Sequence, residues 1–339
     1  MKFGPVPVDQ ALGAISAHSV KLGERVIKKG ATLSADDLAA MRMAHLDTVI
    51  VARLDVDDID ENQAANQLAH ALSAEGVRCD GPSTGRVNLF ATDAGVLRVD
   101  RARVDAFNAI DESVTFATLP DFRAVERGEM IGTVKIIPFA LPKPVLEHAI
   151  ATLGGQSAIA VKPFKRLKIA AISTLLPGLK SSVINKTLAV LEGRLAPSGS
   201  SVDVDLRVAH DVDAVQHAII NALDDESDVV ILYGASAIID RRDVIPSAIE
   251  AIGGHIEHFG MPVDPGNLML IGSARGKTIL GAPGCARSPK ENGFDWVLQR
   301  VMAGIPVTRA DMTALGVGGL LMEIVQRGHP RDLQSVQSE

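Results

Sequence analysis

Apolar residues change their spacing along this 339-residue chain, and the changes predict where strands and helices lie. After residue 167, short apolar runs alternate with segments whose apolar residues recur every three or four positions. Runs of the first kind predict strands, and segments of the second kind predict helices. The expected strands are 168–173, 202–208 and 229–233, and the expected helices are 181–195 and 212–223. This alternation is typical of a parallel sheet with helices on both faces.

The first 165 residues have a different pattern. Segment 7–17 predicts a short helix, and Ser34 followed by Asp37 predicts the start of another, because this spacing forms a capping box. Between residues 84 and 140, short β-type runs separated by turn residues predict a small β-rich domain. The expected fold class is therefore α/β, with a three-layer parallel-sheet domain preceded by a mixed α+β region that contains the small β-rich domain.

The expected domain boundaries follow these changes of pattern. An α+β segment occupies residues 1–83, the small β-rich domain and a connection occupy 84–165, and the α/β domain occupies 166–306. A C-terminal segment covers 307–327. The polar tail 328–339 is expected to be disordered, because it holds too few apolar residues to pack.

Composition excludes several classes of partner. Lys and Arg number 34 and Asp and Glu number 41, so the formal net charge is −7, and only 3% of residues are aromatic. This balance argues against nucleic acid and against an anionic membrane as partners. No apolar run is long enough to span a bilayer, and the N-terminus lacks the apolar core of a signal peptide, so a cytoplasmic location is expected. Cys79 and Cys285 have no metal-binding spacing.

Three loops in the α/β part combine small residues with proline or with charged residues. They are 234–243, 262–266 and 281–284, and each follows or bridges an apolar run. The run Val229–Leu232 before the first loop predicts a strand buried on both faces. Ligands of parallel sheets bind beyond the carboxyl ends of the strands, and small residues there let a ligand approach the backbone closely. The residues alone therefore predict a ligand at the loops after Ser173, Val208 and Tyr233.

The order and spacing of the three loops resemble the molybdopterin-binding domain shared by molybdopterin adenylyltransferases and molybdopterin molybdotransferases. The resemblance covers about residues 166–304. The sequence RDVIP at 242–246 resembles the end of the adenylyltransferase pattern T-G-G-T-G-x-x-x-R-D-V-T-P. Pro265-Gly266 resembles the molybdotransferase P-G-K-P segment, and APGCA at 282–286 resembles L-P-G-N-P. Residues 310–326 resemble a linker that in some bacterial proteins precedes a molybdenum cofactor cytidylyltransferase-like domain.

The sequence departs from the family pattern at acidic residues and glycines. Ala235-Ser236 stands in place of the glycine pair, and His210-Asp211 in place of the acidic pair after the second strand. The family's T-G-D/E after the first strand reads Thr174-Leu175-Leu176, without the acid. These departures indicate that the pocket shape is kept while part of the metal-binding set is lost.

The resemblance also implies roles for individual residues. Asp243 and Asp211 are the expected catalytic acids and Mg²⁺ ligands, since nucleotidyl transfer needs a divalent ion held by carboxylates. From the residues alone, Asp243 is equally a helix-capping acid, His210 a loop histidine and Cys285 a small buried residue. The expected molybdopterin-binding residues are Gly234, Ala235, Ser236, Arg242, Pro265, Gly266, Pro283, Gly284 and Cys285. The additional cations expected near a phosphate are Arg241, Arg287 and Lys290.

Three functions stay open. The first is a protein that binds molybdopterin or its nucleotide derivative in molybdenum cofactor biosynthesis or delivery. The second is an active magnesium-dependent molybdopterin adenylyltransferase or molybdotransferase, so whether the chain is an enzyme is open as well. The third is an α/β interaction domain with a vestigial pocket. The resemblance further implies a homo-oligomer and a cytidylyltransferase partner.

Overall fold

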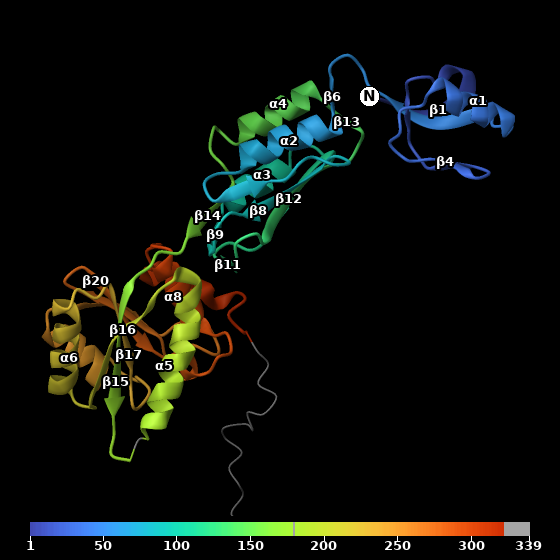
Figure 1. Cartoon of the computed structure of the whole chain (residues 1–339). Coiled ribbons are helices and arrows are strands. Elements are labelled where there is room, and N and C mark those ends of the chain that lie inside the picture. The colour runs from blue at the N-terminus through green and yellow to red at the C-terminus, as the bar shows by residue number, and fades with distance from the viewer. Residues whose placement is uncertain (179, 322–339) are drawn as a thin grey trace, which may run out of the picture. The chain divides into compact units, whose positions relative to one another are not determined.

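The computed structural model describes residues 1–178 and 180–321. It separates at Pro163/Phe164 into two compact units, an N-terminal one and an α/β one. Helices and several sheets occur in both units, so the expected α/β class is confirmed at that level (Figure 1). No helix of the described residues is long and apolar enough to cross a membrane. The expected tail 328–339 and the end of the segment 307–327 lie outside the described residues.

The start of the N-terminal unit is a small sheet with one covering helix. Strands β1 (Lys2–Pro7), β5 (Thr48–Arg53) and β2 (Ile15–Ser16) form an antiparallel sheet in the order β1-β5-β2. Helix α1 (Ala35–Met43) begins at the expected capping box. The remaining elements are η1 (Val8–Gln10), β3 (Val20–Leu22) and β4 (Arg25–Ile27).

The prediction of a helix over 7–17 is wrong. One 3-10 turn, η1, is all the helix that forms there, because Gly13 takes a φ of +72° and the chain then enters β2.

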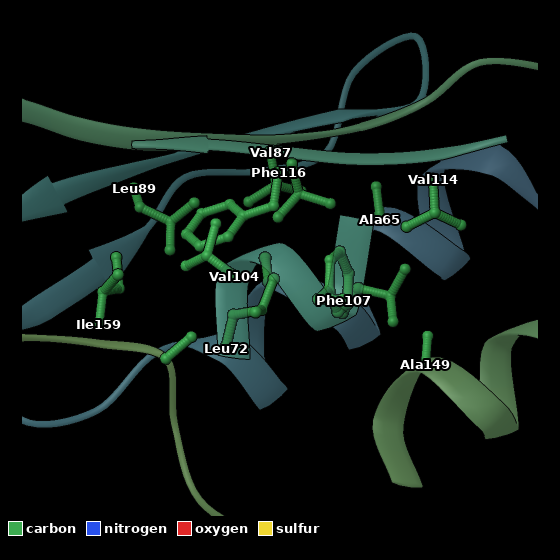
Figure 2. Close-up of a cluster of buried hydrophobic side chains, with 14 of the residues drawn as sticks. Ala65, Leu72, Val87, Leu89, Val104, Phe107, Val114, Phe116, Ala149 and Ile159 are labelled. Carbon is green, nitrogen blue, oxygen red and sulfur yellow. The ribbon is translucent and has the colours of Figure 1, made fainter. Parts of the chain in front are cut away.

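The rest of the N-terminal unit packs three helices against short strands. Figure 2 shows this core, where Leu72, Phe107 and Ala149 from three helices meet Val87 and Leu89 from one strand. The helices are α2 (Glu61–Leu72), α3 (Arg101–Asn108) and α4 (Lys143–Thr152). The strands are β6 (Asp58–Asp60), β7 (Val77–Cys79), β8 (Arg86–Ala91), β9 (Gly95–Val99), β10 (Val114–Thr118), β11 (Ala124–Val125), β12 (Met130–Ile136), β13 (Ala140–Pro142) and β14 (Ile159–Pro163).

The boundary expected at 83/84 does not match this core. It would separate β7 from β8, which pair in the sheet β10-β12-β8-β7, and α2 from the strands it covers. The β-type runs of this region depend for their burial on helices that precede and follow them in the sequence.

The α/β unit is built on one six-stranded sheet in the order β16-β15-β17-β20-β19-β18. Helices α5 and α6 lie on opposite sides of β15–β17 (Figure 1). The strands are β15 (Lys168–Leu175), β16 (Ser201–Ala209), β17 (Val229–Tyr233), β18 (His255–Phe259), β19 (Leu270–Ala274) and β20 (Lys277–Ala282). The helices are α5 (Ser181–Leu195), η2 (Ala196–Ser198), α6 (Val212–Asp224), α7 (Val244–Ala251), η3 (Gly284–Arg287), α8 (Gly293–Met302), α9 (Arg309–Thr313) and η4 (Ala314–Gly316).

Both faces of this sheet are buried, as the continuous apolar run of β17 predicts. Val229, Ile231 and Tyr233 pack with α5 and α8, whereas Val230 and Leu232 pack with α6 and α7. Alternate residues of a strand point to opposite faces, so a strand covered on both sides needs apolar residues throughout.

One strand departs from the expected parallel order. β15, β16, β17 and β20 are parallel, but β19 runs antiparallel to both β20 and β18. Arg275 and Gly276 form a two-residue hairpin with φ values of +49° and +74°, which reverses the chain between β19 and β20. Because β19 is reversed relative to both neighbours, β18 runs in the same direction as β20. The loop after β18 therefore lies at the same edge as the loops after β17 and β20.

Candidate functional site

The three predicted loops meet at the carboxyl edge of the α/β sheet. Loop 234–243 follows β17, loop 283–287 follows β20, and loop 260–269 joins β18 to β19. Loop 234–243 touches the end of β20, because a Cβ on Gly281 would lie 2.9 Å from Ile238 Cδ1. The same Cβ would lie 2.9 Å from the Cβ of Leu270, the first residue of β19, which directly follows loop 260–269. A small residue is therefore needed at position 281, where a side chain would clash with both neighbours.

The start of α8 joins two of these loops. The backbone N–H of Gly293 donates to the carbonyl of Pro265 at 2.9 Å, and Asn292 Nδ2 donates to the carbonyl of Cys285 at 3.4 Å. Gly266 packs directly on this helix end, since a Cβ there would lie 2.6 Å from the Gly293 nitrogen. The predicted residues Pro265, Gly266 and Cys285 are thereby held by one structural element.

A hydrogen-bonded network crosses the edge from β15 to the loop after β17. Thr174 Oγ1 lies 2.8 Å from His210 Nδ1 and accepts the backbone N–H of Ala235 at 2.7 Å. His210 Nε2 lies 3.4 Å from Ser236 Oγ. Ala235 and Ser236 are therefore placed by Thr174 and His210, neither of which was a predicted site residue.

Arg287 braces the site from the other side. Its Nη2 donates to the carbonyl of Gly234 at 2.8 Å, and its Nη1 donates to Thr187 Oγ1 at 3.2 Å. The guanidinium carbon lies 5.6 Å from the Tyr233 ring centroid, and burial lowers the pKa of Arg287. This cation ties η3 and α5 to the end of β17, and its expected contact with a phosphate stays a prediction.

Both predicted metal-binding acids cap helices. Asp211 Oδ1 accepts the N–H of Ala214 at 2.8 Å at the start of α6. Asp243 Oδ1 accepts the N–H of Val244 at 2.8 Å, and its Oδ2 accepts the N–H of Ile239 at 3.3 Å. Across residues 1–178 and 180–321, no three His, Cys, Asp or Glu side chains gather as a metal site. The Mg²⁺ site thus stays a prediction.

Arg242, another predicted residue of the first loop, pairs with a neighbour. Its Nε donates to Asp240 Oδ1 at 2.8 Å, and this exposed contact lowers the pKa of Asp240 to about 2. Pro283 and Gly284 begin η3, and Gly284 is exposed at the edge. Burial raises the pKa of the half-buried Cys285 thiol, which favours the neutral thiol over a thiolate.

We expect Asp243→Ala to lower the free energy of unfolding of the α/β unit by about 1 kcal/mol, the usual contribution of a helix N-cap. Asp243→Asn should cost less, because the amide oxygen still accepts the N–H of Val244. Urea denaturation of the three proteins measures this order. An Asp243→Ala protein of unchanged stability that loses a Mg²⁺-dependent stabilisation would assign the carboxylate to a metal instead.

Tyr233 has a buried hydroxyl without a partner. Its side chain is 1% exposed, and its Oη makes no hydrogen bond within the described residues. Tyr233→Phe keeps the ring beneath Arg287 and removes the unpaired hydroxyl, so we expect the free energy of unfolding to rise by about 1 kcal/mol. Ser227→Ala removes a second hydroxyl of this kind and should shift stability in the same direction. Destabilisation of both variants in urea would show that these hydroxyls have partners.

A groove of about 300 Å³ lies beside the loop between β18 and β19. Its lining includes Pro262, Asn267 and Leu320. The backbone of Asp264 pairs there with residues 319–321, through bonds of 2.8 and 3.0 Å. The chain after η4 therefore covers the outer side of the loop that holds Pro265 and Gly266.

Four side chains at the site were not among its predicted residues: Thr174, Thr187, His210 and Arg194. Thr174 and His210 stand at the ends of two parallel strands, the place where a sheet of this kind gathers side chains. That position was the available signal. Thr187 and Arg194 lie within α5 and contact residues about a hundred positions away, so no local pattern marks them.

Comparison with known proteins gives one partial family match and several similar structures. A family model for a domain of unknown function (DUF8806) matches residues 5–53, the part that contains β1, α1 and β5. No curated protein matches the chain. A molybdopterin biosynthesis MoeA protein from Pyrococcus horikosii is similar at 17% identity and a TM-score of 0.30, over 92% of this chain and 75% of that one.

Two further solved structures are similar to this chain. Molybdenum cofactor biosynthesis protein B is similar at 17% identity and a TM-score of 0.28, over 40% of this chain and 87% of that one. A molybdenum cofactor biosynthesis protein from Pyrococcus furiosus is similar at 12% identity and a TM-score of 0.25, over 92% of this chain and 65% of that one.

Proposed function

We propose that the α/β unit is a three-layer molybdopterin-binding domain, and that the chain binds molybdopterin or its nucleotide derivative in molybdenum cofactor biosynthesis or delivery. The observation that carries this proposal is the meeting of loops 234–243, 262–266 and 281–284 at one edge of the sheet. These are the loops whose order and spacing resemble the family. Small residues in such loops let a pterin approach the backbone closely.

Hydrogen-bond donors at this edge support a ligand that carries a phosphate. The exposed Ser236 presents its hydroxyl, and within the described residues the N–H groups of Ser236 and of the exposed Ala237 donate to no protein acceptor. Unpaired N–H groups in a loop attract anions. Arg241 adds an exposed cation on the same loop.

The engaged carboxylates favour binding over catalysis. Asp211 and Asp243 hold helix starts, and the family's acid after the first strand is Leu176 here. A nucleotidyltransferase needs carboxylates that are free to bind a divalent ion. A cytidylyltransferase partner and self-association belong to this proposal as consequences of the family resemblance.

Titration of the full chain with molybdopterin under anaerobic conditions tests the proposal, with heat as the readout. We expect saturable binding at micromolar concentrations without added Mg²⁺. Absence of binding at these concentrations would overturn it. A parallel assay with ATP, molybdopterin and Mg²⁺ that follows pyrophosphate release tests the adenylyltransferase alternative, because transfer of the AMP group to molybdopterin releases pyrophosphate. Turnover that Asp243→Ala abolishes would establish catalysis.

A further inference from the structure

The buried hydroxyl of Thr174 decides how the His210 ring is protonated. Thr174 is 1% exposed, and its Oγ1 accepts the N–H of Ala235 at 2.7 Å. A buried hydroxyl needs an acceptor for its own hydrogen as well. Within the described residues, the acceptor in reach is His210 Nδ1 at 2.8 Å. The hydroxyl of Thr174 therefore donates to Nδ1.

The opposite arrangement leaves a hydrogen without a partner. If His210 Nδ1 carried the proton, it and the N–H of Ala235 would both donate to Thr174 Oγ1. The hydroxyl hydrogen would then be buried with nothing to accept it, which is unfavourable. A neutral imidazole carries one N–H, so when Nδ1 accepts, Nε2 is the protonated nitrogen.

The chain of bonds continues outward to the exposed edge. His210 Nε2 lies 3.4 Å from Ser236 Oγ, so its N–H donates to this oxygen. Ser236 is exposed, and its own hydroxyl hydrogen is then directed to whatever binds at the edge. The N–H groups of the exposed residues Ser236 and Ala237 add further donors, since neither has a protein acceptor within the described residues.

We propose that Thr174 holds His210 as the Nε2–H tautomer, that His210 thereby orients the Ser236 hydroxyl, and that this hydroxyl with the N–H groups of Ser236 and Ala237 binds a phosphate monoester without a divalent cation. Asp211, the residue after His210, accepts the N–H of Ala214 with its Oδ1. The site thus presents donors where a magnesium site would present acceptors. This inference names the part of the ligand that the site binds. It rests on the proposed function only for the identification of that ligand as molybdopterin.

Long-range proton–nitrogen NMR of the histidines in the full chain tests the tautomer directly. His217 and His70 are internal references for the opposite, Nδ1–H tautomer. Their Nδ1 atoms lie 2.7 and 2.8 Å from the carbonyls of Asp213 and Asn66 and must donate to them. At pH 8 with EDTA, we expect His210 to show a protonated Nε2 and an accepting Nδ1. A His210→Gln sample assigns its signals. A protonated Nδ1 in His210 would overturn the inference, whether or not molybdopterin binds.

Ligand titrations in the same samples test the site. Inorganic phosphate and methyl phosphate are added separately with EDTA present, and both should shift the His210 signals saturably. The two arms separate free phosphate from a monoester: a shift with methyl phosphate supports the proposal, and a shift with phosphate alone contradicts it. A shift that requires Mg²⁺ also contradicts it.

Two variants report on the individual donors. Ser236→Ala changes an exposed side chain and should weaken methyl phosphate binding about tenfold, the effect of one hydrogen bond to an anion. Thr174→Val keeps the side-chain shape but frees the ring, so His210 should become a mixture of tautomers. Unchanged binding in Ser236→Ala, or an unchanged His210 spectrum in a folded Thr174→Val protein, would refute the assignment. The spectrum of the unaltered protein decides the tautomer even if Thr174→Val fails to fold.

Discussion

Arg194→Ala is expected to lower the free energy of unfolding of the α/β unit by about 3–5 kcal/mol, the range found when one partner of a buried ion pair is removed. Arg194 Nε donates to Asp295 Oδ1 at 2.6 Å, with the two side chains 8% and 12% exposed. The guanidinium also donates to the carbonyls of Ala286 and Ser288 at 2.7 and 2.8 Å. Alanine would leave a buried carboxylate and two carbonyls without their donor.

Arg275→Ala is the matched control for this prediction. Arg275 Nη1 lies 2.6 Å from Asp224 Oδ1, the same distance, but these side chains are 54% and 61% exposed. Surface pairs contribute at most about 1 kcal/mol. Urea denaturation of both variants should therefore separate them by at least about 2 kcal/mol. Equal losses in the two variants would show that burial of the Arg194 pair has no energetic consequence.

Gly266→Ala is expected to cost about 3 kcal/mol and to displace the loop between β18 and β19. Gly266 has a φ of +137°, which L-residues rarely adopt. A Cβ there would lie 2.6 and 2.7 Å from the nitrogen and Cα of Gly293, and neither backbone atom can move aside. Because the same contact holds Pro265 at the site, molybdopterin binding should be lost as well.

Gly276→Ala separates backbone strain from steric clash as causes of the lost stability. Gly276 also has a positive φ, +74°, but nothing lies within 4 Å of its Cβ position. It should lose about 1 kcal/mol from backbone strain and keep its molybdopterin affinity. If Gly266→Ala is no less stable than Gly276→Ala in urea, the loop does not pack on α8 as described.

The sheet of the α/β unit could be predicted largely because its first three strands each connect to the next through a helix. In such an arrangement β15, β16 and β17 become neighbours, because strand–helix–strand connections are short and right-handed. β19 could not be predicted in the same way. Its direction depends on Arg275-Gly276, a weaker hairpin signal than Asn-Gly, and its short apolar run fits either direction.

The meeting of the three loops at one edge of the sheet could be predicted from sequence, but the contacts of their charged residues could not. Order and spacing identified the loops, because glycine and proline mark backbone positions that side chains cannot occupy. The roles of Asp243 and Arg287 could not be separated from sequence. A carboxylate at a helix start suits a cap and a metal equally, and a cation near a strand end suits a phosphate and a carbonyl equally. Contacts between distant residues, such as Arg287 with Gly234, decide between them.

Hydrogen–deuterium exchange of the full chain, with and without molybdopterin, tests most directly whether the three loops form one pocket. The prediction is that peptides covering 234–243, 262–267 and 283–287 gain protection together at one ligand concentration, while residues 1–163 are unchanged. Protection confined to a single loop, or found only within residues 1–163, would contradict the account.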